Sequence, residues 1–154
     1  MSIEKSEVKL YLDSCCYNRP FDNQNQMRIH VESLAKMKIQ RLIIDRKYKL
    51  VTSVVLYYEN SRNRNELSAE RIESYMDTYS DEYVNEIDYQ KLADLINEII
   101  SKGLKKMDAA HIACAIYAGC DYFITTDDKI LSLKDERIKV INPVDFVSIK
   151  GASE

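Results

Sequence analysis

The sequence has 154 residues, of which 45% are hydrophobic, with only three glycines and two prolines. This composition suits one folded core and excludes long linkers, so we predict a single domain over residues 1–154 with its core in about residues 8–147. No apolar run reaches the roughly 18 residues of a membrane span, and the N-terminal residues lack the apolar segment of a secretory signal, so we expect a soluble, cytoplasmic protein that does not enter a membrane.

Charge is unevenly distributed along the chain, although the formal net charge is only -3. Residues 1–65 hold 12 Lys and Arg against 7 Asp and Glu, residues 66–98 hold 2 against 10, and residues 99–154 hold 8 against 8. A polyanion would avoid the acidic middle and approach the other two parts, where Arg19 is one of the basic residues. The four cysteines show no C-x-x-C spacing and are expected to be reduced and mostly buried.

The first third of the chain predicts a strand, a loop and a long helix. Residues 8–12 are a β-prone run that ends at Asp13 and Ser14, and residues 15–25 contain a proline and three asparagines, which favour a loop. From about residue 26 to residue 46, apolar residues recur at helical spacing, which predicts an amphipathic helix. Its apolar face would consist of Met27, Val31, Leu34, Met37, Leu42 and Ile43 or Ile44.

The next stretch predicts a second strand and further helices. Residues 48–52 form another β-prone run, and Ser53 is placed to cap a helix that starts at Val54 and carries Glu59 about two turns in. Periodicity and stop signals then predict a helix at residues 66–80, a short extended piece at residues 83–87, and a helix from Asp88 to Gly103.

An alanine-rich helix is predicted over about residues 105–118, with small or apolar side chains on nearly every face. Asp108 lies in its first turn, and Gly119 is expected to end it as a C-cap glycine. Residues 122–125 predict a buried strand that leads directly to Asp127.

A brief helix at residues 130–133, a strand at residues 138–141 and a terminal turn or helix after Pro143 complete the chain. This alternation of strands and helices predicts an α/β fold of three layers, α/β/α, with a mainly parallel sheet. The nucleotide-cradling loops G-x-G-x-x-G and G-x-x-x-x-G-K-[ST] are missing. Because there are only two histidines and no recognisable nucleophile setting, acyl-transfer chemistry is poorly supported.

Four acids lie where chain topology would bring them to the carboxyl edge of such a sheet: Asp13, Glu59, Asp108 and Asp127. Carboxylate oxygens suit Mg²⁺ or Mn²⁺, and two such ions about 4 Å apart can promote hydrolysis of a phosphodiester. Each acid also has a simpler interpretation. Asp108 could support its helix through the macrodipole, Asp127 could cap the following helix, and Glu59 could be solvated. His111, one turn after Asp108, is expected to pack or hydrogen-bond locally and to transfer no proton.

Four segments resemble, in order and spacing, the motifs of the PIN-domain nucleases, which include the bacterial VapC-like ribonucleases. They are LYLDS, the stretch from Ser53 to Glu59, MDAAHIACA and FITTD. The resemblance covers roughly residues 8–147, including the closing VINPVDF.

The resemblance implies that Asp13, Glu59, Asp108 and Asp127 are the catalytic acids and hold Mg²⁺ or Mn²⁺. Thr125 matches the hydroxyl residue that precedes the last acid, and Asp128 is an alternative to Asp127. Supporting or substrate-contacting roles fall to Ser14, Thr125, Asp128 and Arg19.

Family members commonly cleave single-stranded RNA, often as homodimers, and many are toxins of VapC-type toxin-antitoxin pairs. The resemblance therefore implies a metal-dependent endoribonuclease with an RNA substrate, a homodimeric state and a protein antitoxin as a partner. The alternative is a non-catalytic module of the same fold that binds RNA or protein.

Overall fold

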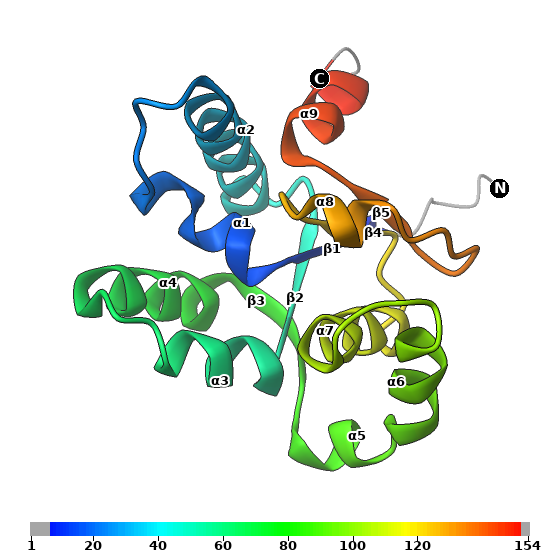
Figure 1. Ribbon diagram of the computed structural model, residues 1–154. Coiled ribbons are helices and arrows are strands. Elements are labelled where there is room, and N and C mark those ends of the chain that lie inside the picture. Colours follow the sequence, from blue (N-terminus) through cyan, green and yellow to red (C-terminus); the bar gives the residue numbers. More distant parts are fainter. Residues whose placement is uncertain (1–6, 152–154) are drawn as a thin grey trace, which may run out of the picture.

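The computed structural model describes residues 7–151. Its sheet has five strands in the order β3-β2-β1-β4-β5, and every pairing is parallel. Figure 1 shows helices on both sides of the sheet, which confirms the predicted three-layer α/β/α fold. The strands are β1 (Lys9–Leu12), β2 (Lys49–Ser53), β3 (Ser80–Val84), β4 (Tyr122–Ile124) and β5 (Lys139–Ile141).

Helices fill the connections between the strands and follow the last one. Those between β1 and β3 are α1 (Ser14–Asn18), the 3-10 helix η1 (Arg19–Phe21), α2 (Met27–Ile44), α3 (Val54–Ser61) and α4 (Glu66–Tyr79). Those after β3 are α5 (Glu86–Gln90), α6 (Ala93–Ile100), α7 (Lys106–Tyr117), α8 (Asp128–Leu131) and α9 (Pro143–Gly151). Within residues 7–151, no helix combines the length and apolar character that crossing a bilayer requires.

The central strand β1 is buried on both faces of the sheet. It pairs with β2 on one side and with β4 on the other, and Leu10, Tyr11 and Leu12 are fully buried. The Tyr11 ring stacks on Phe123 of β4 with the ring centroids 5.2 Å apart. A parallel strand covered on both faces has no solvent side, so its residues form a continuous apolar run rather than an alternating one.

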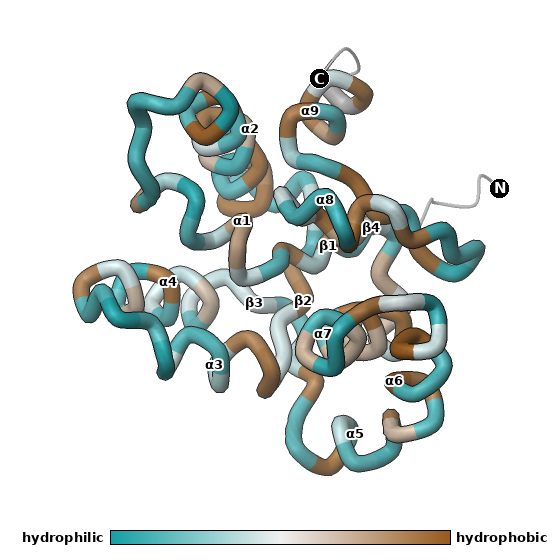
Figure 2. The backbone as a smooth tube through the Cα atoms, in the orientation of Figure 1, coloured by the Kyte–Doolittle hydropathy of each residue, from teal (hydrophilic) through white to brown (hydrophobic). Residues whose placement is uncertain are grey.

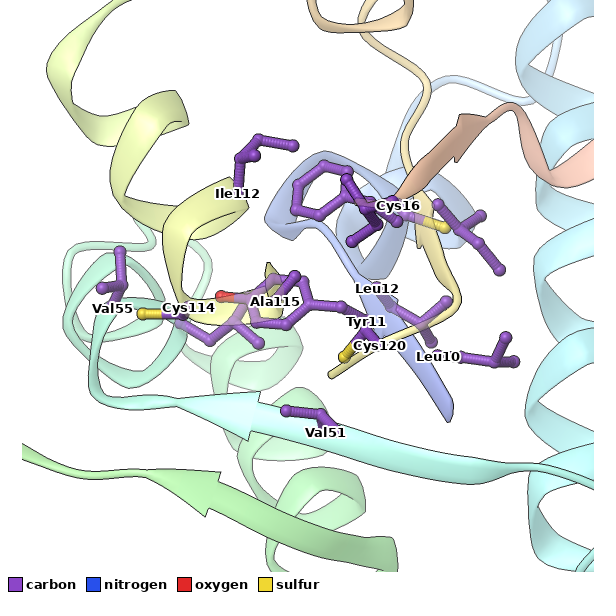
Figure 3. Close-up of a cluster of buried hydrophobic side chains, with 14 of the residues drawn as sticks. Leu10, Tyr11, Leu12, Cys16, Val51, Val55, Ile112, Cys114, Ala115 and Cys120 are labelled. Carbon is purple, nitrogen blue, oxygen red and sulfur yellow. The ribbon is translucent and has the colours of Figure 1, made fainter. Parts of the chain in front are cut away.

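The alanine-rich helix α7 forms as predicted and packs against α3, α6 and β2. Every residue from 109 to 115 is buried, because small side chains let neighbouring backbones approach the helix closely. Figure 3 shows Ile112, Cys114 and Ala115 of α7 in one cluster with buried residues of β1. Gly119 ends the helix with φ +74, and the Gly119 and Cys120 amides donate to the last turn of α7 as in a Schellman motif.

The predicted loop at residues 15–25 is wrong in its first half, because α1 and η1 occupy it. The side chain of Asp13 accepts a hydrogen bond from the Ser14 amide and so caps α1, and Pro20 lies in the first turn of η1, where it costs no hydrogen bond. All four cysteines are free, and all but Cys15 are buried, as expected.

Two predicted boundaries within the acidic residues 66–98 also differ from the structure. The extended piece predicted at residues 83–87 is β3, which begins earlier, at Ser80, because it pairs with β2 from there. The helix predicted from Asp88 is two helices, α5 and α6. The first of them begins before Asp88, because Asn85 and Asp88 form a capping box at its start.

Helix α2 differs most from its prediction. Four residues of the predicted apolar face are exposed, namely Met27, Val31, Leu34 and Met37, whereas Leu42 and Ile43 are buried as predicted. The polar residues Glu32, Ser33 and Lys36 are buried as well. In Figure 2, hydrophobic and hydrophilic residues are mixed along this helix. The reason is the polar inner surface that α2 meets.

This inner surface satisfies the buried polar groups of α2. Glu32 accepts hydrogen bonds from Arg19, Arg28 and Asn142. The Lys36 ammonium bonds Gln40 and lies over the rings of Tyr17 and Tyr75. Buried polar groups are stable only with such partners, so tertiary contacts outweigh the apolar pattern of the helix.

Candidate metal centre

Asp13 lies at the carboxyl end of β1, where two neighbouring segments hold its carboxylate. The side chain is only 6% exposed. It accepts hydrogen bonds from the Ser14 amide at 2.9 Å and from Thr125 Oγ1 at 2.9 Å. The backbone amide of Asp13 donates to the Ile124 carbonyl, so the ends of β1 and β4 are joined. This arrangement directs the carboxylate toward the edge of the sheet in a defined orientation.

Glu59 reaches the same edge from α3. Ser53 caps that helix as predicted, because its hydroxyl accepts a hydrogen bond from the Leu56 amide at 3.2 Å. Glu59 Oε1 contacts Ser14 Oγ and His111 Nε2, each at 2.6 Å. The hydrogen bond from His111 is the main reason why the pKa of Glu59 is lowered. Glu59 is therefore fixed by two donors and is not the solvated glutamate of the simpler interpretation.

His111 is the functional candidate that the sequence interpretation underestimated. The ring is fully buried in α7, with Nε2 at Glu59 and Nδ1 at 2.7 Å from the Tyr11 hydroxyl, which in turn contacts Ser53 Oγ at 2.6 Å. Burial lowers the pKa of His111, but the Glu59 hydrogen bond and the charge of Asp13 outweigh burial, and the pKa is raised. Its hydrogen bonds are not local but extend to β1 and α3. A histidine in an otherwise apolar helix, one turn after Asp108, was the available signal.

Asp108 and Asp127 occupy the helix start and the strand end that the sequence predicted. Asp108 lies in the first turn of α7, and its pKa is raised first by burial and then by the negative charges of Asp13 and Asp127. Asp127 follows β4 and caps α8, accepting hydrogen bonds from the Lys129 and Ile130 amides. The capping interpretation of Asp127 is thus confirmed, and it leaves carboxylate lone pairs free for a second partner.

These four acids, called the acidic cluster below, are electrostatically coupled, since the charges of the other three all raise the pKa of Asp108. The basic group beside them is His111, whose Nε2 lies 2.6 Å from Glu59 and 3.9 Å from Asp13. One ligand atom from each of Asp13, Glu59 and His111 lies within 4.8 Å of the other two, whereas Asp108 and Asp127 do not belong to this closely spaced group. Within residues 7–151, no lysine or arginine forms an ion pair with any member of the acidic cluster. One imidazole does not balance four carboxylates, and partly buried carboxylates without a balancing charge are costly, so this edge of the sheet favours a bound cation.

Two of the four supporting residues contact the acidic cluster, and the other two are held by different partners. Ser14 donates to Glu59, and Thr125 donates to Asp13 while accepting from the Asp127 amide at 3.1 Å. Asp128 has a side chain that is 76% exposed and pairs with both terminal nitrogens of Arg28, which lowers its pKa. The Arg19 guanidinium is held by Asp22 and Glu32. The contacts of Asp128 and Arg19 therefore direct both side chains to other partners.

A parallel α/β sheet whose carboxyl edge gathers acids around one point defines the class of protein. The PIN domain family model matches residues 10–136, so this chain belongs to the PIN domain family, and the predicted family is confirmed. No curated protein sequence matches the chain.

Among solved structures, the chain is similar to one in the crystal structure of VapBC2 from Rickettsia felis bound to a DNA fragment from their promoter. The TM-score is 0.55 at 12% identity, and the match covers 88% of this chain and 98% of the other. This similarity confirms the fold.

Proposed function

We propose that this protein is a metal-dependent endoribonuclease that hydrolyses phosphodiester bonds of single-stranded RNA. The observation that carries the proposal is the acidic cluster. Ligand atoms of Asp13, Glu59 and His111 lie within 4.8 Å of one another, and burial together with the charges of Asp13 and Asp127 raises the pKa of Asp108. Membership of the PIN domain family supports the same chemistry. We also propose that residues 1–154 act as one domain.

The side chains at the sheet edge fit a small divalent cation. Asp13, Glu59, Asp108 and Asp127 offer the carboxylate oxygens that Mg²⁺ and Mn²⁺ prefer. His111 is less suited as a ligand, because both ring nitrogens already have hydrogen-bond partners. When bound, the metal ions would supply positive charge that activates a water and stabilises the phosphate undergoing substitution.

The chain itself positions these oxygens. Thr125 and the Ser14 amide hold Asp13, while Ser14 Oγ and His111 hold Glu59. Such supporting hydrogen bonds fix the orientation of ligands before substrate arrives. In the reaction, water adds to phosphorus, the bond to the leaving ribose oxygen breaks, and that oxygen takes up a proton.

The proposal is tested by substituting two acids from different elements. We expect Asp13→Asn and Asp108→Asn to lower Mn²⁺-dependent cleavage of a fluorescent single-stranded RNA by about a hundredfold or more, since loss of a ligand exceeds the 10- to 100-fold cost typical of supporting residues. Asp145→Asn, at an exposed position in the first turn of α9, is the matched control and should cleave normally.

Two results would contradict the proposal. Cleavage by Asp13→Asn and Asp108→Asn at the wild-type rate would place the chemistry elsewhere. Tight RNA binding by the wild-type protein with no cleavage in Mg²⁺ or Mn²⁺ would favour the alternative, a non-catalytic binding module.

The partners are part of the same proposal. We propose that the protein forms a homodimer and that a protein antitoxin inhibits it, as the second member of a toxin-antitoxin pair. The fold shared with a chain of VapBC2 supports this idea, and so do the exposed apolar side chains of α2. Sedimentation of the purified protein, and its co-purification with the product of the neighbouring reading frame, test the two partners separately.

A further inference from the structure

A pocket of about 210 Å³ adjoins the acidic cluster. Ser14 and Glu59 belong to its lining, so the pocket lies beside the Glu59 carboxylate rather than at a distant surface. Any RNA whose phosphate lies at the acidic cluster would place a neighbouring nucleotide within reach of this pocket.

Three asparagines give the pocket a polar wall whose orientation is already fixed. Asn63 Nδ2 donates to Asn18 Oδ1 at 2.9 Å, and Asn18 Nδ2 donates to the Ser14 carbonyl at 2.9 Å. Asn60 is held by a hydrogen bond from Nδ2 to the Ala69 carbonyl at 2.9 Å. Because an amide nitrogen carries two hydrogens, Asn18 and Asn63 each keep one further donor.

Two polar atoms of the pocket residues have no hydrogen-bond partner among the described residues. They are the hydroxyl of Tyr17, a side chain only 1% exposed, and Oδ1 of Asn60. Buried polar atoms are nearly always paired, so an unpaired donor and an unpaired acceptor on two residues of the lining indicate an absent partner. That partner must offer both donors and acceptors.

The chemistry of the remaining lining excludes two classes of ligand. No lysine or arginine lines the pocket and Glu59 is negative, so a phosphate or another anion would be repelled. A purely apolar ligand would leave the asparagines and Tyr17 unpaired. Leu56, Ile72 and Met76 nevertheless provide an apolar surface suited to the face of a flat ring.

We propose that this pocket binds one nucleobase of single-stranded RNA beside the cleaved bond, which makes Tyr17 and Asn60 specificity-determining residues. The inference rests on the proposed function. A nucleobase is neutral and flat, and it carries donors and acceptors along its edge, which is free to be read in single-stranded RNA. The pocket volume equals the liquid volume of about seven water molecules, which is enough for one base.

The test measures binding without cleavage. Four six-nucleotide RNAs, identical except for one central A, C, G or U, are titrated against the whole protein by fluorescence anisotropy. Ca²⁺ replaces Mn²⁺, because it neutralises the acids with oxygen ligands but in a different coordination geometry. We expect the wild-type protein to prefer one base by about tenfold in Kd, which is the effect of one or two hydrogen bonds. Tyr17→Phe and Asn60→Ala should reduce the preference to about threefold or less, whereas Asn97→Ala, on the exposed side of α6, should keep it.

Tyr17→Phe keeps the test decisive, because it removes only a hydroxyl that has no partner and should not lower the melting temperature. Equal affinity of the wild-type protein for all four RNAs would overturn the inference, as would an unchanged preference in both variants. Base preference in Ca²⁺ with no cleavage in Mn²⁺ would exclude the nuclease function but not the base pocket. Cleavage of all four RNAs with equal rate and affinity would remove the base pocket alone.

Discussion

His111 connects three elements that are far apart in the sequence. Its two ring nitrogens contact Glu59 of α3 and Tyr11 of β1, and Tyr11 contacts Ser53 at the end of β2. All of these contacts are 2.7 Å or shorter, and the ring is buried. A histidine held in this way sets the position of the Glu59 carboxylate, which makes His111 a positioning residue for the acidic cluster.

Replacing His111 should therefore weaken metal binding without removing a ligand. We expect His111→Leu to lower the affinity for Mn²⁺ by about 10- to 100-fold in calorimetric titration, the usual cost of losing a group that orients a ligand. His111→Gln should retain more affinity, since its amide can still donate to Glu59. Wild-type affinity in His111→Leu, with the fold intact by circular dichroism, would rule out the positioning role.

At the scale of elements, α7 and α2 show when a sequence pattern is sufficient to predict both a helix and the side of it that is buried. The composition of α7 and its C-terminal glycine predict the helix, its burial and its end, because small side chains and positive φ are local properties. The apolar spacing of α2 predicts a helix but not which side faces the protein. Glu32 and Lys36 lie inside because Arg19, Asn142 and two tyrosine rings, all distant in the sequence, meet them there.

The exposure of several apolar residues of α2 predicts that substitutions of apolar residues on this helix will differ widely in their effect on stability. Leu34→Lys should change the free energy of unfolding by no more than about 0.5 kcal/mol, because the side chain is 56% exposed. Ile39→Ala, on the buried side of the same helix, should cost about 2–5 kcal/mol. Urea denaturation of both variants provides the measurement, and equal costs would show that Leu34 faces the core.

At the scale of the whole molecule, the parallel topology brings four distant acids to one edge of the sheet. The same packing buries Lys36, whose pKa burial lowers to about 8. Between pH 8 and the ordinary lysine pKa of 10.5, the unfolded chain binds more protons at Lys36 than the folded protein does. Stability from this residue must therefore rise with pH across that window and remain at its minimum below it.

The corresponding prediction compares the wild-type protein with Lys36→Met, a variant of similar length without a charge. Relative to Lys36→Met, the wild-type protein should gain up to about 3 kcal/mol of unfolding free energy between pH 8 and pH 10.5, because one pKa unit corresponds to about 1.4 kcal/mol. Urea denaturation across this range measures the difference, in which the titration of groups that do not interact with Lys36 cancels. A difference that does not change with pH would show that Lys36 keeps an ordinary pKa in the fold.

The sequence by itself determined the succession of the strands and of the longer helices, the parallel three-layer fold, the PIN domain family and the positions of the four acids along the chain. These features follow from local periodicity, caps and short motifs. Only the tertiary structure decided which face of α2 is buried, that His111 contacts Glu59, that Asp128 pairs with Arg28 and that Tyr17 and Asn60 line one pocket. Each of these depends on which side chains meet across elements, and a one-dimensional pattern does not encode the partner of a side chain.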